Sequence, residues 1–304
     1  MACVLGIDGG GSRTTAALAR DGHMVAEAIG PASNVRTHGV AASIAVLSDV
    51  TDRLLADAPD PDDVAAVCAG LAGAGHAKER APIEAWLDGR FTGLPTTVVA
   101  DVELVLAGGT PDRVGIAIVA GTGSIAFARD RRGMTARAGG RGPAIGDPGS
   151  GYAIGRAALI AITESLDGVR PESAMIRRFR EQELVVGPDG LGAWSQPADL
   201  ATLAELVAES ADAGDGTAAR ILVTAGAALA AQALAVLRRL GFHGKVPAAL
   251  AGGVLLNVPR VRDTLLERLG HNGVQLAPIE LVEHPVTGAI RLAEGLSQSG
   301  AASR

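Results

Sequence analysis

The stretch Asp8-Gly9-Gly10-Gly11-Ser12 carries the sharpest chemical signal in the sequence. Glycines have no Cβ atom, so three in a row allow backbone N–H groups to approach an anion closely. The hydroxyl groups of Ser12 and Thr14 add further donors. The carboxylate of Asp8 would repel a bare phosphate, so its presence makes sense if a Mg²⁺ ion lies between the two groups. The pattern predicts a phosphate-binding loop with a metal ion at Asp8, and a tight hairpin with an exposed acid is the alternative.

Two further glycine loops occur later in the chain, at Gly121-Thr122-Gly123 and at Gly252-Gly253. The first fits the dinucleotide pattern Gly-x-Gly-x-x-Ala, but a predicted strand follows it, whereas that pattern must open a helix. A phosphate chain held between two similar glycine hairpins is the better interpretation. Gly252-Gly253 lies between a predicted strand and a predicted helix, where a backbone without side chains can lie flat against a planar ring.

The elements that must position these loops follow from the periodicity of apolar residues. The predicted strands are Cys3–Ile7, Arg13–Ala19, Met24–Ala28, Val64–Ala69, Thr97–Ala100, Gly115–Val119, Ile125–Arg129, Met134–Ala138 and Val246–Ala251. The predicted helices are Val40–Ala56, Ala77–Leu87, Gly151–Ser165, Pro197–Ser210, Thr217–Leu240, Pro259–Leu269 and Val286–Leu296.

An internal repeat indicates how these elements are organised. Gly11-Ser12 recurs as Gly123-Ser124 after 112 residues, and Ala19-Arg20-Asp21 recurs as Ala128-Arg129-Asp130 after 109 residues. Solenoid repeats run about 20–50 residues, so this spacing indicates duplication of a whole domain. We predict two α/β domains that face a cleft, residues 1–107 with helix 285–298 packed back on them, and residues 108–284.

Composition excludes several classes of protein. The chain has 304 residues, of which 48% are hydrophobic and 20% charged, so it is not disordered. A net charge of −6 with 2% aromatic residues argues against a nucleic-acid partner. The two lysines, Lys78 and Lys245, do not follow a glycine loop as Gly-Lys-Ser/Thr, which excludes a P-loop NTPase. The six histidines form no zinc-binding pattern.

The longest apolar run, residues 221–237, has 17 residues, and a bilayer span needs about 20. It is predicted to be a buried helix, and the protein to be cytoplasmic with no membrane partner. Cys3 and Cys68 lie in apolar runs and are predicted to be buried thiols in a reducing compartment.

Taken in order, four motifs resemble those of the N-acetylglucosamine kinase family, which is grouped with BadF/BcrA-type ATPases in the superfamily of actin, sugar kinases and heat-shock chaperones. They are DGGGS (8–12), AGTGS (120–124), GDPGSGY (146–152) and AGGV (251–254), and the resemblance extends from Val4 to about Leu296. It implies two actin-like (ribonuclease H-like) α/β lobes with a duplicated core, ATP and Mg²⁺ in the cleft, phosphoryl transfer to a sugar hydroxyl, and a homodimer.

The resemblance also implies roles for single residues. Asp101 matches the catalytic base, which would take the proton of the sugar's 6-hydroxyl. It directly follows a predicted strand, where open α/β sheets place their sites, although capping of the next helix is the alternative. Asn34 and Asp147 match sugar ligands, with a loop asparagine and a structural turn aspartate as the alternatives. Thr122 matches a position that contacts sugar or phosphate, and the adenine is expected near Gly252-Gly253.

The sequence departs from the family pattern around the expected sugar site. Gly139-Gly140-Arg141-Gly142-Pro143 stands where the family often has Gly-Gly-Trp-Gly-His, and Pro148 replaces an acid. Gly140 and Arg141 are expected to contact the substrate, and a guanidinium offers five donors where tryptophan offers an apolar face. A cation favours an acyl oxygen or a carboxylate, as in N-acetylglucosamine or N-acetylmuramic acid. Relatives specific for glucosamine can carry the same Gly-Gly-Arg, so glucosamine is an alternative substrate.

Three other functions compete with an amino-sugar kinase. An ATPase that activates dehydratases through an iron–sulfur cluster needs cysteine ligands, but no cysteine follows Cys68. An actin-like filament module would lack the set Asn34, Asp101 and Asp147. A non-catalytic nucleotide or sugar sensor would keep the binding loops, and it remains an alternative together with an ATPase module that acts on a protein partner.

Overall fold

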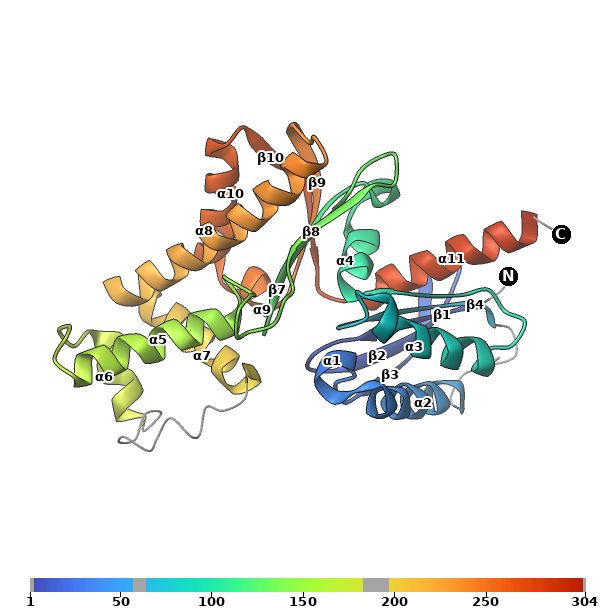
Figure 1. Ribbon diagram of the computed structural model, residues 1–304, viewed down its shortest axis with the longest axis horizontal. Helices are drawn as coiled ribbons and strands as arrows, with labels where there is room; N and C mark the ends of the chain where they lie inside the picture. Colours follow the sequence, from blue (N-terminus) through green and yellow to red (C-terminus); the bar gives the residue numbers. More distant parts are fainter. Residues whose placement is uncertain (1–2, 57–63, 183–196, 303–304) are drawn as a thin grey trace. The chain divides into compact units, whose positions relative to one another are not determined.

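The computed structural model describes residues 3–56, 64–182 and 197–302, in which the chain forms two compact α/β units (Figure 1). Unit 1 comprises Met1–Arg113 and Val282–Arg304, and unit 2 comprises Val114–Leu281. The chain therefore passes from unit 1 to unit 2 after residue 113 and back to unit 1 after residue 281. The boundaries predicted from the sequence lay after residues 107 and 284. The first boundary lies later because a helix that ends at Gly109 and the turn after it contact each other within unit 1.

Unit 1 is built on a five-stranded sheet with the strand order β3-β2-β1-β4-β5. Strands β1, β2 and β3 form an antiparallel meander, whereas β1, β4 and β5 run parallel. The central strands are continuous apolar runs because helices cover both of their faces, and the edge strand β3 alternates between exposed and half-buried residues. The strands are β1 (Cys3–Gly9), β2 (Thr14–Arg20), β3 (His23–Gly30), β4 (Val64–Leu71) and β5 (Thr96–Ala100).

Two pairs of helices cover this sheet. Residues of α2 and α3 pack with Leu5 and Ile7 on one face, and residues of α4 and α11 pack with Val4 and Cys68 on the other. α11 crosses α4 closely, since a Cβ atom at Gly288 would lie 1.9 Å from the carbonyl oxygen of Leu104. The helices of unit 1 are α1 (Val35–His38), α2 (Val40–Ala56), α3 (Ala77–Arg90), α4 (Asp101–Gly109) and α11 (Val286–Ala302), with a 3₁₀ turn at Pro111–Arg113.

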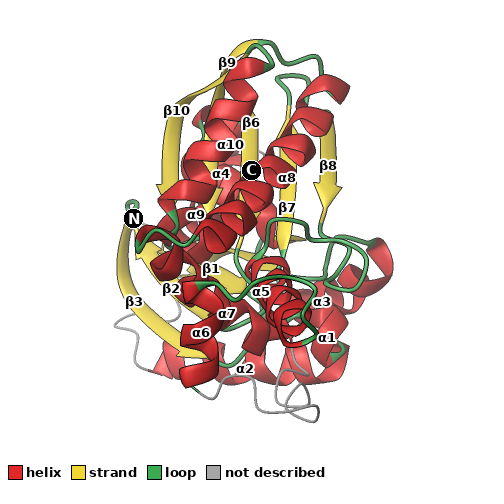
Figure 2. Ribbon diagram, turned by 90° about the vertical axis from the view of Figure 1, so that its left-hand side faces the viewer, coloured by secondary structure: helices red, strands yellow, loops and turns green. Residues whose placement is uncertain are grey.

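Unit 2 repeats the sheet of unit 1. Its strand order, β8-β7-β6-β9-β10, matches β3-β2-β1-β4-β5, with an antiparallel meander followed by a parallel neighbour of its first strand. Figure 2 shows these five strands side by side, with α8 and α10 in front. The predicted α/β fold with a duplicated core is thereby confirmed. The strands are β6 (Gly115–Ala120), β7 (Ser124–Arg129), β8 (Thr135–Gly139), β9 (Gly244–Ala251) and β10 (Val274–Val282).

The longest helix of unit 2, α8, contains the apolar run noted in the sequence. An 18-residue window in it has a mean hydropathy of 1.8, so by length and composition it could cross a membrane. Half of that window is buried, however, in a core shared with α5, α7, α10 and the sheet, as expected for a core helix. The helices of unit 2 are α5 (Gly151–Leu166), α6 (Ala174–Glu181), α7 (Pro197–Asp212), α8 (Gly216–Arg239), α9 (Gly253–Asn257) and α10 (Pro259–His271).

Strand β10 and the short helices α1, α6 and α9 were not predicted from the sequence as separate elements. In β10 the apolar residues are interrupted by Gln275, Pro278 and Glu280, so the sequence shows no unbroken apolar run. Helices of four to eight residues offer too few turns for a periodic signal.

Candidate functional site

Two carboxylates, Asp8 and Asp101, lie at the same edge of the sheet of unit 1. Asp8 is paired with Gly70 of the parallel strand β4, and Asp101 directly follows Ala100, which is paired with Leu71. The carboxyl ends of β1 and β5 are therefore level, and Gly70, which lies on the strand between them, has no side chain. The predicted position of Asp101 at a strand end is correct, and it is the first residue of α4.

The two carboxylates share the face of the sheet that α4 and α11 cover. A Cβ atom at Gly6 would meet Ile290 and Ala289 of α11, and one at Gly70 would meet Leu104 of α4. Asp8 lies two residues after Gly6 in the same strand, so its side chain leaves the sheet on this face. Asp101 begins the helix that packs there.

The electrostatics of this edge are unusual. Burial, and then the negative charge of Asp101, raise the pKa of Asp8 to about 7, although Arg13 opposes the rise. Burial also raises the pKa of Asp101, and the charge of Glu103 adds to this, while the N–H of Val102 donates a 2.9 Å hydrogen bond that opposes it. A carboxyl whose pKa is raised toward neutrality suits a general base.

The same edge suits a divalent cation. Two poorly solvated carboxylates that repel each other gain from a positive charge, and carboxylate oxygens are ligands that Mg²⁺ prefers. In the described part of the chain, no group of three or more His, Cys, Asp or Glu side chains could enclose a metal ion. A Mg²⁺ ion at Asp8 would therefore take its other ligands from water and a bound phosphate.

The first glycine loop is a tight hairpin between β1 and β2. The N–H of Gly10 donates to the carbonyl of Arg13 (2.9 Å), which leaves Gly11 and Ser12 exposed at the tip. Gly9 is closely packed, since a Cβ atom there would lie 2.2 Å from Leu71 Cδ2 and 2.5 Å from Ser33 Oγ. The available backbone N–H groups are thus those at the tip, next to Asp8.

Thr14 does not take the place expected for a phosphate ligand. It is fully buried, its hydroxyl donates to the carbonyl of Pro31 (2.6 Å), and it lies 2.7 Å from Ser33 Oγ. This is a correction to the sequence analysis: because Thr14 faces the opposite side of the sheet from Asp8, it anchors the loop after β3 instead of donating to an anion.

Asn34 lies beside this loop and begins α1. Its Oδ1 accepts a hydrogen bond from the N–H of Arg36 (3.0 Å), so the oxygen caps the helix. Its Nδ2 points toward Gly11, 4.0 Å from where a Cβ atom of that residue would lie. The side chain is half-buried, and its amide N–H groups face the glycine loop.

In unit 2 the second and third glycine loops lie against each other. A Cβ atom at Gly252 would lie 2.5 Å from the carbonyl of Ala120, and one at Gly121 would lie 3.9 Å from the nitrogen of Gly253. The carbonyl of Gly121 also accepts a 2.7 Å hydrogen bond from the N–H of Gly151, at the start of α5. The structure therefore brings together two loops separated by about 130 residues, with Thr122 and Gly123 half-buried beside them.

Asp147 ties the second glycine loop to the segment that follows β8. It is 6% exposed, and its Oδ1 accepts from the N–H groups of Arg141 (3.1 Å) and Gly142 (3.4 Å). Burial raises its pKa in spite of these hydrogen bonds. Its Oδ2 would lie 2.9 Å from a Cβ atom at Gly123. The structural turn role, which was the alternative to a sugar ligand, thus accounts for much of this geometry.

Gly140 and Arg141 lie on the same segment. Gly140 has a φ of +64°, a Cβ atom there would lie 2.9 Å from Ile125 Cδ1, and its N–H donates to the carbonyl of Ser124 (2.8 Å). Arg141 is exposed, so its guanidinium is accessible to a ligand.

Two residues near the carboxylates were not predicted. The Glu103 Oε1 accepts a hydrogen bond from the N–H of Ala100 (3.2 Å), so it caps α4. The three-residue spacing typical of a capping box was the available signal. The positive charge of Arg13 opposes the rise in the pKa of Asp8. The position of Arg13 directly after the glycine loop was the available signal in the sequence.

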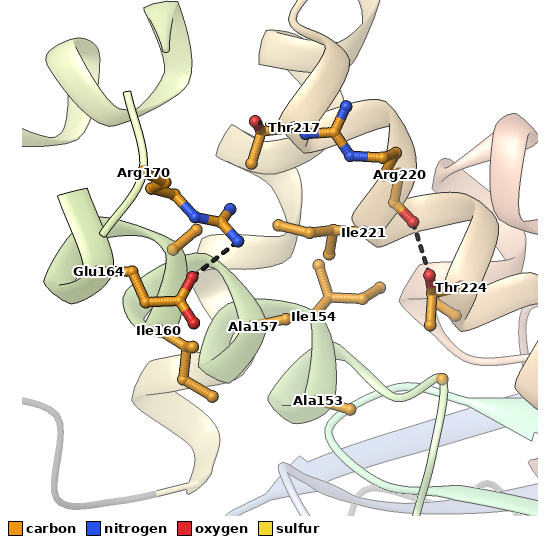
Figure 3. Close-up of a pocket in the computed structure, with 13 residues that line it drawn as sticks. Ala153, Ile154, Ala157, Ile160, Glu164, Arg170, Thr217, Arg220, Ile221 and Thr224 are labelled. Atoms are coloured by element: carbon orange, nitrogen blue, oxygen red, sulfur yellow. Dashed lines mark hydrogen bonds and ion pairs between the residues drawn. The ribbon is translucent and has the colours of Figure 1, made fainter. Parts of the chain in front are cut away.

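A pocket of unit 2 lies between α5 and α8, with Gly149 among its lining residues (Figure 3). It has a volume of about 430 Å³ and is lined mainly by alanine and isoleucine, with Glu164 and Arg170 joined by a 2.7 Å ion pair at one side. Its lining includes none of the predicted site residues, so we do not assign the predicted chemistry to it.

Comparison with known proteins agrees with the resemblance. Residues 5–293 match the family described as the BadF/BadG/BcrA/BcrD ATPase family. The chain is 30% identical to the N-acetylmuramic acid/N-acetylglucosamine kinase of Clostridium acetobutylicum over 303 residues, which cover 96% of this chain and 98% of that protein. It is 28% identical to the N-acetyl-D-glucosamine kinase of Dictyostelium discoideum, over 95% of this chain and 97% of that one. A crystal structure from Chromobacterium violaceum, provisionally named an N-acetylglucosamine kinase, matches with a TM-score of 0.75 at 27% identity, over 96% of this chain and 99% of that one.

Proposed function

Because the chain belongs to the BadF/BadG/BcrA/BcrD ATPase family, we propose that it is an ATP-dependent kinase that phosphorylates the 6-hydroxyl of N-acetylglucosamine or N-acetylmuramic acid. The names of the two curated relatives support this class of substrate. The observation that carries the proposal is the pair Asp8 and Asp101 beside a glycine hairpin at one sheet edge. Glucosamine is the alternative substrate, because Arg141 alone does not decide the 2-substituent.

The residues of unit 1 supply the chemistry of transfer. The N–H groups of Gly11 and Ser12 at the hairpin tip bind phosphate oxygens, and Asp8 would hold Mg²⁺ directly or through water. When bound, Mg²⁺ neutralises part of the phosphate charge. Asp101 accepts the proton of the sugar hydroxyl as its oxygen bonds to the γ-phosphorus. The bond from that phosphorus to the bridging oxygen breaks, and ADP leaves with the electron pair.

The residues of unit 2 bind and orient. We assign the phosphate chain to Gly121, Thr122 and Gly123, and the adenine to Gly252 and Gly253. The contact between these two loops supports the assignment, because one nucleotide can span both. The amide of Asn34 in unit 1 and the segment from Gly140 to Asp147 in unit 2 are assigned to the sugar, with Asp147 acting partly by holding that segment.

The observations disfavour an ATPase that activates a dehydratase. Such a protein needs cysteine ligands for an iron–sulfur cluster. The chain has two cysteines, Cys3 and Cys68, and both are buried within strands of unit 1.

The test is ADP release from ATP and Mg²⁺ with a panel of N-acetylglucosamine, N-acetylmuramic acid, glucosamine, glucose and no sugar. Release that depends on one amino sugar would establish the kinase. Equal release with and without sugar would indicate an ATPase that acts on a protein partner, and bound ATP without release would indicate a sensor.

The Asp101→Asn variant tests the assignment of the base. We expect kcat to fall at least about 10²-fold with secondary structure unchanged, since general base catalysis contributes on this scale. Asp49→Asn is the control, because Asp49 is an exposed residue of α2 whose ion pair with Arg53 lies at the surface. An Asp101→Asn variant with near-normal turnover would contradict the assignment.

We further propose that the protein is cytoplasmic and forms a homodimer. Light scattering of the purified protein would give its mass in solution, and a value near 30.5 kDa would exclude the dimer.

A further inference from the structure

Arg13 continues the hairpin that carries the glycine loop. In the antiparallel pair of β1 and β2, Asp8 is opposite Thr15 and Gly9 is opposite Thr14. The hydrogen bond from the N–H of Gly10 to the carbonyl of Arg13 extends this register by one pair, with a two-residue turn at Gly11-Ser12. Arg13 is thus part of the ladder, not of a loose loop.

The register decides on which face of the sheet Arg13 lies. Side chains alternate along a strand, so Arg13 and Thr15 share a face, and Asp8 shares it as the partner of Thr15. Thr14 confirms the alternation, since its hydroxyl bonds on the opposite face to Pro31. Arg13 is therefore the diagonal neighbour of Asp8, a separation that a long side chain can bridge.

The guanidinium of Arg13 is available for a ligand. The residue is exposed, and within the described ranges no ion pair or side-chain hydrogen bond holds its guanidinium. Its positive charge nevertheless acts on the carboxyl of Asp8. Arg13 is thus a cation near the metal-binding carboxylate of Asp8, on the same face as Asp101, and without a fixed partner. Such a cation is suited to bind a group whose negative charge develops only during the reaction.

We propose that Arg13 contacts the γ-phosphoryl group during transfer and stabilises its developing charge, so that it is a catalytic residue of the reaction; this rests on the proposed kinase function. As the sugar oxygen bonds to phosphorus and the bond to the bridging oxygen breaks, negative charge spreads over three phosphoryl oxygens. A planar guanidinium presents two parallel N–H groups to two of these oxygens, a fixed bidentate geometry that the ammonium group of lysine does not have.

The test compares Arg13→Met and Arg13→Lys with Arg53→Met. Arg53 is a half-exposed arginine of α2 in the same unit, so its replacement controls for loss of one charge. For each variant kcat and KM would be measured, together with the affinity for a non-hydrolysable ATP analogue and for ADP with aluminium fluoride, which mimics the transferring group. We expect Arg13→Met to lower kcat at least about 10²-fold and to weaken aluminium fluoride binding, with analogue affinity within about threefold of normal. Arg13→Lys should lose less, because it keeps the charge.

The results separate this proposal from the proposed function. If the unaltered protein phosphorylates no sugar, the kinase function itself fails. If it does so and Arg13→Met keeps kcat within threefold, or loses affinity for both analogues equally, the transition-state role of Arg13 is wrong. Circular dichroism checks that each variant folds. If the apolar side chain of methionine prevents folding, Arg13→Gln replaces Arg13→Met.

Discussion

Replacement of Asp8 by asparagine should make the ligand-free protein more stable while it removes activity. The folded protein raises the pKa of this carboxyl from 3.8 to about 7, through burial and the charge of Asp101. A raised pKa means that the folded state binds the proton more tightly than the unfolded chain does. Stability is therefore greatest below pH 4, falls as the pH rises through 7, and then stays constant.

The size of the effect follows from this pKa. Roughly three pH units separate 3.8 from about 7, and each corresponds to about 1.4 kcal/mol, so the ionised carboxylate destabilises the folded protein by about 4 kcal/mol at pH 8. At pH 5 the same relation gives about 1–2 kcal/mol. Asparagine has a similar shape and no charge, so Asp8→Asn should recover these amounts at each pH.

Urea unfolding of both proteins at pH 5 and pH 8, followed by circular dichroism in the presence of EDTA, would measure the difference. Asp49→Asn is again the control, because this exposed side chain should give no comparable gain. An Asp8→Asn protein that is equally stable or less stable than the unaltered one at pH 8 would refute the reasoning. A gain in stability together with loss of sugar phosphorylation would support Asp8 as the residue that holds Mg²⁺.

Three further predictions concern packing, capping and the metal. Gly288→Val should destabilise unit 1 by at least about 3 kcal/mol in urea, because a Cβ atom would lie 1.9 Å from the carbonyl of Leu104. Gly295→Ala in the same helix meets no atom within 4 Å and should stabilise by up to about 1 kcal/mol, so similar effects for the two would contradict this. Burial opposes ionisation of Asp215, but hydrogen bonds, among them one of 2.7 Å from the N–H of Met175, hold its pKa below the usual range. Asp215→Ala should therefore cost about 2–3 kcal/mol at pH 7 and less as the pH falls below 4, and a loss independent of pH would exclude the carboxylate as its source. EDTA should abolish sugar phosphorylation and excess Mg²⁺ should restore it, whereas activity without divalent metal would contradict the role of Asp8.

Local signals account for what could be predicted from the sequence. Glycine runs mark the three loops because only glycine lets a backbone pass so close to its neighbours, as at Gly9 and Gly252. Apolar runs mark the central strands because they are buried on both faces. Asp8 and Asp101 could be placed at strand ends because each lies within a few residues of one element. The duplicated sheet could be predicted because the pair Gly-Ser recurs after 112 residues.

Other features depend on contacts between distant parts of the chain, and periodicity does not report them. The hydroxyl of Thr14 looks like a phosphate donor until the fold brings Pro31 and Ser33 to it. Asp147 is a possible sugar ligand by motif, but the fold surrounds it with backbone N–H groups of the preceding segment.

The kind of chemistry can be recognised from residue types and spacing, because glycine loops and carboxylates at strand ends are local features. Which side chains act on one another depends on the fold. The register of β1 with β2 and β4, and of β4 with β5, puts Asp8, Arg13 and Asp101 on one face and Thr14 on the other. A shift of one residue would reverse every side chain, and only the packed sheet and helices determine that register.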